Sequence, residues 1–287
     1  MRSLLFVPAD SERKLAKGRE SEADALILDL EDSVAAARRP EARRIARAFL
    51  AATRAGKQRF YVRINPLVGD TPLDDLAAVM PAKPDGIMLP KATPDGVRTL
   101  AHYLSAFEAA AGSASGSTRI VAIATETPGA VFELGGYRGA SPRLEALTWG
   151  AEDLAAAIGC VNRKPDGAYD DVFRLARSLC VLAASAAEAT AIDTVFTDFN
   201  DERGLEAECG ATRRMGFTAK MAIHPAQVAA INRAFSVSAD EIAWARKVID
   251  AFAANAEAGT IGIDGRMIDR PHVVLAQRIL ARGGAKH

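Results

Sequence analysis

Charged side chains follow nearly every short apolar run of this 287-residue chain. The stretch LILDLED at 26–32 ends in three carboxylates, Asp29, Glu31 and Asp32. Neighbouring carboxylates repel one another, so they need a cation, a hydrogen-bond donor or bulk water nearby. Later runs are followed by Arg63 and Asn65, by Lys91, by Glu126, by Glu152 and Asp153, by Asp198 and by His224. This repetition indicates one shared site.

Two of these acids, Glu126 and Asp153, follow consecutive runs and could converge on one hard cation. Two protein carboxylates, with the other positions held by water or substrate oxygen, are typical of Mg²⁺. No second histidine stands near them in the sequence to form a nitrogen-rich zinc or iron site. The alternative is that Glu126 caps a loop and that Asp153, in GAEDL, is the N-cap of the next helix.

The cations Arg63 and Lys91 each have two interpretations. Arg63, in YVRINP, suits bidentate capture of a carboxylate, or it is paired with Glu31 or Asp32. These two readings are compatible, because an arginine held by an acid is already oriented. Lys91, in MLPKAT, could form a Schiff base. Acids at the same site favour an electrostatic or salt-bridge role instead.

Four further residues could bind or react. Arg13, Lys14 and Lys17 follow the first apolar run, with Ser11 as the expected N-cap, and this basic helical turn could hold the phosphates of a long cofactor. A solvated helix face is the alternative. His224, in AIHPAQ, could be a general base, but its position between a strand and a proline favours a structural role.

Short apolar runs alternate with longer helical patterns along the chain. The apolar runs are residues 3–7, 25–30, 59–64, 86–90, 119–125, 146–150, 191–196 and 219–225. Such alternation predicts βαβ units and a parallel sheet buried on both faces. Eight units favour an α/β fold of the closed (β/α)8 TIM barrel type over an open doubly wound sheet. The charged residues after each run would then meet at the carboxyl ends of the strands.

A further segment follows the eight units. We expect a catalytic barrel over residues 1–232 and a C-terminal helical and ribbon extension over 233–287, packing on the barrel or on a neighbouring subunit. Ser238 and Glu241 have the spacing of a capping box at the start of a helix. TIGIDGRMIDRP (260–271) is predicted to be a short hairpin, with a last helix after it.

Composition narrows the class of protein. Thirty-six basic and 36 acidic residues give zero formal net charge, which supplies no electrostatic argument for nucleic acid or a membrane surface. The three cysteines match no zinc or CxxC spacing. No signal peptide is recognisable at the N-terminus. We therefore expect a cytoplasmic protein.

Taken together, these stretches resemble the citrate lyase β-subunit-like branch of the HpcH/HpaI aldolase superfamily, with its malyl-CoA, citramalyl-CoA and citryl-CoA lyases. The matching motifs are RSLLFVPADSERKLAKG, ADALILDLEDSV, FYVRINP, DGIMLPKA, ATETPGAV, LTWGAEDLAAAIG, AKMAIHPAQ and IDGRMIDRPH. The resemblance implies a TIM barrel that uses Mg²⁺, with Mn²⁺ as an alternative, and that assembles into homotrimers or hexamers. It also implies a coenzyme A thioester and a 2-keto acid as small-molecule partners.

The resemblance also implies roles for single residues. Glu126 and Asp153 would be the metal ligands. Arg63 would hold the keto-acid carboxylate, helped by Lys91 and by the backbone around Gly150, Ala151, Glu152 and Asp153. From their position beside these cations, we expect Glu31 and Asp32 to support catalysis by holding the basic residues or waters on the metal, and Asp29 to be structural. Asp269, in RMIDRP, would be the acid and base that acts in a neighbour's site, with Asp264 as its alternative, and Arg13, Lys14 and Lys17 would bind coenzyme A.

The expected reaction is reversible cleavage of a 3-hydroxyacyl-CoA into acetyl-CoA, or a similar acyl-CoA, and a 2-keto acid. A malyl-CoA thioesterase or a malate synthase-like condensation is the alternative on the same scaffold. A non-catalytic binding protein is a more distant one.

Overall fold

The computed structural model describes residues 1–53, 56–69 and 71–284. They divide into two compact units, Met1–Ala234 and Phe235–His287. Within the described part of the chain, no helix is long and apolar enough to cross a membrane.

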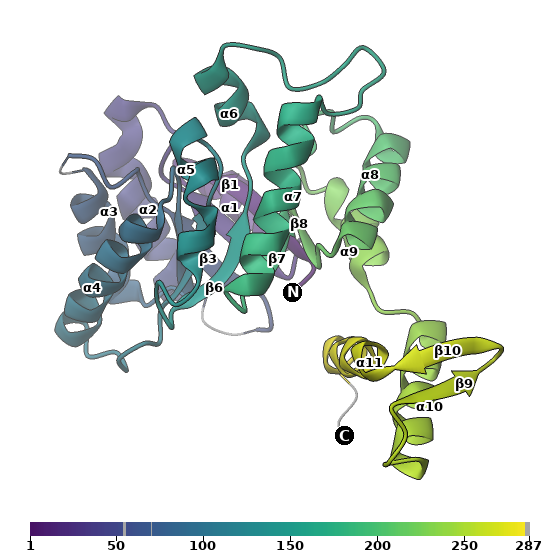
Figure 1. Ribbon diagram of the computed structural model, residues 1–287. Helices are drawn as coiled ribbons and strands as arrows, with labels where there is room; N and C mark the ends of the chain where they lie inside the picture. Colours follow the sequence, from purple (N-terminus) through teal and green to yellow (C-terminus); the bar gives the residue numbers. More distant parts are fainter. Residues whose placement is uncertain (54–55, 70, 285–287) are drawn as a thin grey trace. The chain divides into compact units, whose positions relative to one another are not determined.

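The first unit is a closed barrel of parallel strands in sequence order, as predicted (Figure 1). The strands are β1 (Ser3–Pro8), β2 (Ala25–Asp29), β3 (Arg59–Arg63), β4 (Gly86–Leu89), β5 (Arg119–Ile123), β6 (Leu144–Thr148), β7 (Thr190–Asp193) and β8 (Ala219–Ala222). Closure rests on the pairing of β1 with β8, where Ser3, Leu4 and Leu5 oppose Lys220, Met221 and Ala222. An open sheet would leave these two edges unpaired, so the barrel interpretation was correct.

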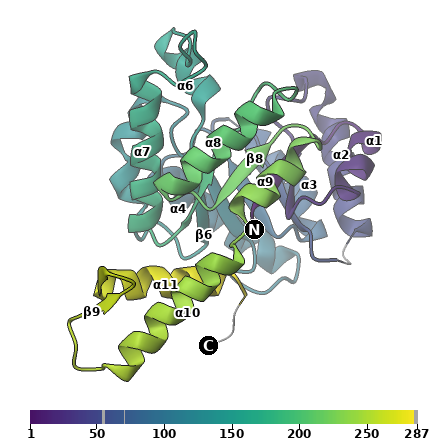
Figure 2. The same ribbon diagram turned by 90° about the vertical axis from the view of Figure 1, so that its right-hand side faces the viewer.

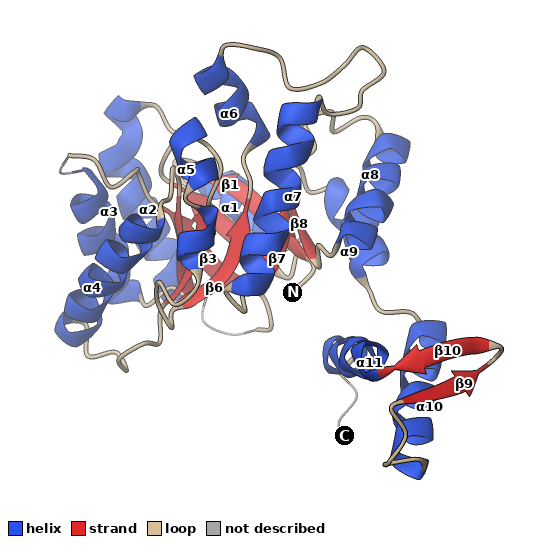
Figure 3. Cartoon of the chain, viewed as in Figure 1, coloured by secondary structure: helices blue, strands red, loops and turns tan. Residues whose placement is uncertain are grey.

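Helices surround the strands, as Figures 2 and 3 show. The α-helices of this unit are α1 (Glu12–Arg19), α2 (Arg39–Ala52), α3 (Thr71–Val79), α4 (Pro94–Ala110), α5 (Pro128–Phe132), α6 (Ala151–Ile158), α7 (Asp171–Ala186), α8 (Glu202–Met215) and α9 (Gln227–Phe235). Short 3-10 turns occupy Ala36–Arg38, Met80–Ala82 and Leu134–Tyr137. Ser11 accepts a hydrogen bond from the Lys14 amide and is the N-cap of α1, as predicted.

Apolar side chains from the strands fill the barrel. The cluster consists of Leu4, Ala25, Ile27, Tyr61, Met88, Val121, Ile123, Ala146, Ile192, Ala219 and Met221. Because side chains alternate along a strand, the other half of each strand faces the surrounding helices. Because the apolar cluster fills the interior, a functional site is expected in the loops at the carboxyl ends of the strands.

A second unit follows the barrel. It contains α10 (Ala239–Ala254), the antiparallel hairpin β9 (Thr260–Ile263) and β10 (Arg266–Asp269), and α11 (Arg270–Arg282). The hairpin was predicted, and so was the capping box that Ser238 and Glu241 form at α10. Its own core includes Ala245, Val248, Phe252, Ile263, Ile268, Ala276 and Leu280.

A buried ion cluster joins β7 and β8 to helices α7 and α8 and reaches Trp149, which follows β6. Asp193 is fully buried and accepts hydrogen bonds from Lys220 at 2.7 Å and from Arg177 at 2.9 Å and 3.1 Å. It also accepts one from the indole of Trp149 at 2.8 Å. Trp149 directly precedes Gly150, so this cluster fixes the turn on which the candidate site is built.

We expect Asp193→Ala to lower the free energy of unfolding by about 3–5 kcal/mol, because it removes the acid between two buried cations. Glu208 would then be the nearest acid to both, 2.8 Å from Lys220 but 4.0 Å from Arg177. Equilibrium urea unfolding followed by circular dichroism measures this loss. Asp166→Ala, which removes an exposed loop carboxylate, is the control and should change the free energy by less than about 0.5 kcal/mol. Equal effects of the two substitutions would contradict the role given to the cluster.

Candidate functional site

Arg63 is held first by Asp29. The two residues end β3 and β2 and lie directly opposite each other in the strand register. Arg63 Nε and Nη2 donate to the two Asp29 oxygens at 2.7 Å and 2.6 Å. Burial would raise the pKa of Asp29, but the hydrogen bonds and charge of Arg63 outweigh it and lower that pKa. The predicted pairing of Arg63 with Glu31 is confirmed at 2.9 Å, but the bidentate partner is Asp29, for which only a structural role was predicted.

Glu31 and Asp32 lie differently from each other. Glu31 is buried, with Oε2 2.9 Å from Arg63 Nη1 and Oε1 2.8 Å from Lys91 Nζ. Asp32 is 56% exposed, and its nearest oxygen is 3.7 Å from Arg63. Burial raises the pKa of Glu31 above its ordinary value despite the two cations. Glu31 is thus the shared acid between the two cations, and Asp32 is peripheral.

Lys91 connects three acids. Its backbone amide donates to Glu126 Oε2, and its ammonium lies 2.8 Å from Glu31 and 3.2 Å from Asp153. The backbone has a φ of +47°, a left-handed conformation that is uncommon for a residue with a Cβ. Burial would lower the pKa of Lys91, but its acidic partners outweigh this and raise it. An ammonium that stays protonated is a poor Schiff-base nucleophile, so the electrostatic role is the better supported one.

Glu126 and Gly150 are packed against each other. Glu126 follows β5 and is 3% exposed. A Cβ added at Gly150 would lie 2.6 Å from Glu126 Cγ, so the close approach of β6 to this carboxylate requires a glycine. Burial, together with the negative charge of Asp153, raises the pKa of Glu126 to about 8 although the Lys91 amide opposes the shift. Glu126 is therefore a buried acid without sufficient positive charge beside it.

The turn after β6 starts helix α6. Gly150 is its N-cap, so the alternative that Asp153 is the N-cap is wrong. Ala151, Glu152 and Asp153 form the first turn, whose amides have no partner within the helix. Glu152 is exposed and accepts a hydrogen bond from Asn162 at 2.7 Å, whereas Asp153 approaches Lys91. Gly150 donates its own amide to Thr125 at 3.2 Å.

The acids outnumber the bases at this end of the barrel. Five carboxylates (Asp29, Glu31, Asp32, Glu126 and Asp153) face two cations (Arg63 and Lys91), which leaves three negative charges when all are ionised. Within residues 1–53, 56–69 and 71–284, no group of three or more histidine, cysteine or acidic side chains is arranged to hold a metal ion. The arrangement suits a hard cation that takes its remaining ligands from water or substrate.

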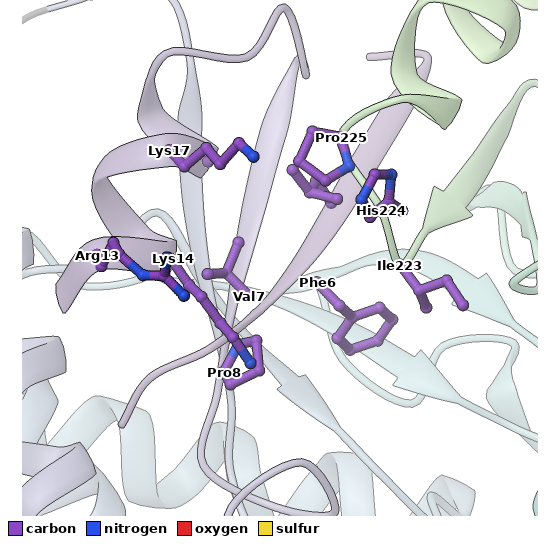
Figure 4. A pocket seen from close by; sticks show the side chains of 11 residues that line it. Phe6, Val7, Pro8, Arg13, Lys14, Lys17, Ile223, His224 and Pro225 are labelled. Atoms are coloured by element: carbon purple, nitrogen blue, oxygen red, sulfur yellow. The ribbon is translucent and has the colours of Figure 1, made fainter. Parts of the chain in front are cut away.

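A cavity of about 460 Å³ lies beside β1 (Figure 4). It is lined by Leu5, Phe6, Val7, Pro8, Arg13, Lys14, Lys17, Gly18, Ile223, His224 and Pro225. Figure 4 shows the three basic side chains on one side and the His224–Pro225 segment on the other, with Val7 and Pro8 between them. One basic and one partly apolar wall suit a long ligand that carries both phosphate and apolar parts.

Phe6 joins this cavity to the acidic cluster. It lines the cavity, and its ring lies 4.8 Å from the Arg63 guanidinium carbon. Sequence reasoning missed Phe6, although an aromatic residue inside the first strand was the available signal. The cavity and the cluster therefore adjoin through one side chain.

His224 is exposed and stacks on Phe199 with ring centroids 5.2 Å apart. Its Nδ1 accepts a hydrogen bond from the Ala226 amide at 3.3 Å. This contact fits the structural interpretation. Its place in the cavity wall also leaves it available to a ligand.

In the second unit, Asp269 ends β10 and is the N-cap residue of α11. One of its oxygens lies 2.5 Å from His272 Nδ1, and its side chain is 33% exposed. The alternative, Asp264, is in the hairpin turn with a φ of +50° and pairs with Lys247 at 2.5 Å. Sequence reasoning missed His272, which the three-residue spacing from Asp269 in DRPH could have suggested.

The chain matches known proteins over almost its full length. The model of the HpcH/HpaI aldolase/citrate lyase family matches residues 2–225. A citrate lyase subunit beta-like protein of Mycobacterium tuberculosis is 36% identical over 281 residues, which cover 98% of this chain and 94% of the relative. A (3S)-malyl-CoA thioesterase of Cereibacter sphaeroides is also 36% identical, over 290 residues that cover 99% and 95% of the two chains.

Solved structures agree with these matches. The crystal structure of CitE from Mycobacterium tuberculosis in complex with magnesium, acetoacetate and coenzyme A superposes with a TM-score of 0.77 at 33% identity, covering 99% of this chain and 98% of that one. The barrel, the family model and the relatives all agree with the family that the sequence motifs indicate. This chain therefore belongs to the HpcH/HpaI aldolase/citrate lyase family.

Proposed function

We propose that this chain is a Mg²⁺-dependent carbon–carbon lyase. Its substrate would be a 3-hydroxyacyl-CoA of the malyl-, citramalyl- or citryl-CoA type, and its products acetyl-CoA, or a similar acyl-CoA, and a 2-keto acid. The observation that carries the proposal is an acidic cluster in excess of its cations, beside a cavity walled by three basic side chains. A bound cation would compensate the excess negative charge of the cluster, and an anionic thioester would compensate the positive charge of the cavity wall.

Glu126 and Asp153 would hold the Mg²⁺, with Mn²⁺ as an alternative. The fit rests on the buried Glu126 carboxylate, whose raised pKa reflects missing positive charge, and on the glycine that lets β6 approach it. The bound ion would supply positive charge where negative charge develops on the reacting oxygen.

Arg63 would bind the carboxylate of the keto acid. Each of its nitrogens already faces an acid, but the two Nη atoms carry two N–H groups each, which leaves donors for a ligand. Its orientation is fixed by Asp29, so little side-chain entropy would be lost on binding. The free amides of Ala151, Glu152 and Asp153 would add donors from the first turn of α6.

Arg13, Lys14 and Lys17 would bind the phosphates of coenzyme A. The thioester end would then extend toward Phe6, which lines the same cavity and lies beside Arg63. Asp269 would exchange the proton with the thioester enolate. In the proposed homotrimer or hexamer, it would do so in the site of a neighbouring subunit.

Hydrolysis is the second candidate function, because one of the relatives is a (3S)-malyl-CoA thioesterase. Malate synthase-like condensation and non-catalytic binding are further alternatives.

Product analysis tests the proposed function. Incubation with malyl-, citramalyl- or citryl-CoA and Mg²⁺ should release acetyl-CoA and a 2-keto acid in equal amounts, measured by liquid chromatography. Asp153→Asn should lower the rate by at least about 10²-fold, because it removes a charge needed in the transition state. Free CoA without a keto acid would instead identify a thioesterase, and no product from any of the three would contradict an enzymatic role on them.

Mg²⁺ affinity should depend on pH, because Glu126 must lose its proton to bind the ion. Below its pKa of about 8, each unit of pH should raise the affinity by about tenfold, and the affinity should level off above pH 8. Calorimetric titration at pH 7 in two buffers of different ionisation enthalpy should detect about one proton released per ion. Glu126→Gln is the control and should show neither the binding nor the proton, and a constant affinity from pH 6 to 9 would contradict the assignment.

Asp269→Asn should stop thioester enolisation and spare keto-acid binding, since it removes the base and leaves the barrel unchanged. Proton exchange from the methyl group of acetyl-CoA in deuterated water, followed by NMR, should slow by about 10²–10⁴-fold. Binding of the keto acid should change by less than twofold. Asp264→Asn is the matched control in the same hairpin and should exchange at the wild-type rate.

Mixing two inactive variants tests whether Asp269 acts between subunits. Co-refolded Asp153→Asn and Asp269→Asn chains should regain part of the wild-type turnover, because some sites then combine two intact contributors. Activity no higher than the sum of the separate variants would place Asp269 in the site of its own chain.

A further inference from the structure

Lys91 occupies the centre of the acidic cluster in an unusual backbone conformation. Its amide reaches Glu126, and its ammonium lies between Glu31 and Asp153 at 2.8 Å and 3.2 Å. One residue therefore contacts both proposed metal ligands. A left-handed backbone is unfavourable for a non-glycine residue, so this position is held by the contacts that Lys91 makes.

The two ammonium contacts are unequal. Glu31 is 3% exposed and is also paired with Arg63, which fixes it in place. Asp153 has a side-chain exposure of 32%, and its contact with Lys91 is the longer one. Lysine is a compact charge on a flexible stem, so the ammonium can leave Asp153 without leaving Glu31.

We propose that Lys91 is the internal counter-ion of Asp153 and that a divalent cation must displace its ammonium from that carboxylate. Lys91 thereby weakens cation binding and is a positioning residue for the acids of the site. This inference rests on the proposed metal site and goes beyond it, because it assigns the residue that sets the affinity of the site.

Charge explains the direction of the effect. An ammonium a few ångströms from the ion repels it, and this repulsion is only partly screened because the side chain is 34% exposed. A neutral side chain of similar length removes the repulsion but keeps the backbone amide that faces Glu126. The affinity for the ion should therefore increase when the charge is removed.

The test is calorimetric titration of the full chain with MgCl2 at pH 9, where proton competition is small. Lys91→Met should bind Mg²⁺ at least threefold more tightly than the wild type, and Lys91→Gln should do the same. Lys91→Arg retains the charge and should stay within twofold of the wild type. Thermal unfolding of each variant checks that the fold is intact.

Lys83→Met is the matched control. Lys83 also has a left-handed backbone, with a φ of +54°, but its ammonium contacts the Gly112 carbonyl at 3.3 Å on the exposed surface. It should leave Mg²⁺ affinity unchanged. Equal or weaker binding by both neutral Lys91 variants would overturn the inference, as would tightening by Lys91→Arg to the same degree. A wild-type chain that binds no Mg²⁺ would overturn the proposed metal site as well, which separates the two failures.

Discussion

The ion pair between Asp29 and Arg63 is the constraint around which the mouth of the barrel is arranged. It spans two neighbouring strands at the same register position, so the backbone ladder already determines its geometry. Two oxygens facing two nitrogens at 2.6 Å and 2.7 Å leave the guanidinium little freedom. Arg63 then pairs with Glu31, and Glu31 pairs with Lys91. Lys91 in turn contacts Glu126, which follows β5, and Asp153, which is in α6. The cluster is thus a chain of contacts that begins at one rigid pair.

A second group of charges is buried between the strands β7 and β8 and the helices α7 and α8. Asp193 accepts hydrogen bonds from Lys220, Arg177 and the indole of Trp149, and Lys220 also donates to Glu208. The mouth carries uncompensated negative charge, whereas in this second group two acids, Asp193 and Glu208, balance two cations, Lys220 and Arg177. Excess negative charge favours the binding of a cationic ligand, whereas a fully paired group of charges makes the part of the barrel that supports the site rigid. The two clusters meet at Trp149 and Gly150, which are adjacent in sequence.

Much of the architecture could be predicted from the sequence, because parallel strands buried on both faces leave continuous apolar runs and the acids mark where each run ends. The hairpin and the capping box of the second unit were equally local signals. Partnerships across the barrel were harder to predict. Asp29 looked structural because sequence does not reveal the register that sets it opposite Arg63. Phe6 looked like an ordinary core residue, and the left-handed backbone of Lys91 has no marker such as glycine.

The ring of Phe6 has one face toward the cavity and the Arg63 guanidinium beside it. A change that reshapes the cavity there for a bulkier thioester would also move the group that faces the acids. Under the proposed function, this one side chain would influence recognition of both the thioester and the charged part of the substrate. Substitutions at Phe6 in β1 and at Arg63 in β3 should therefore have coupled effects on the site.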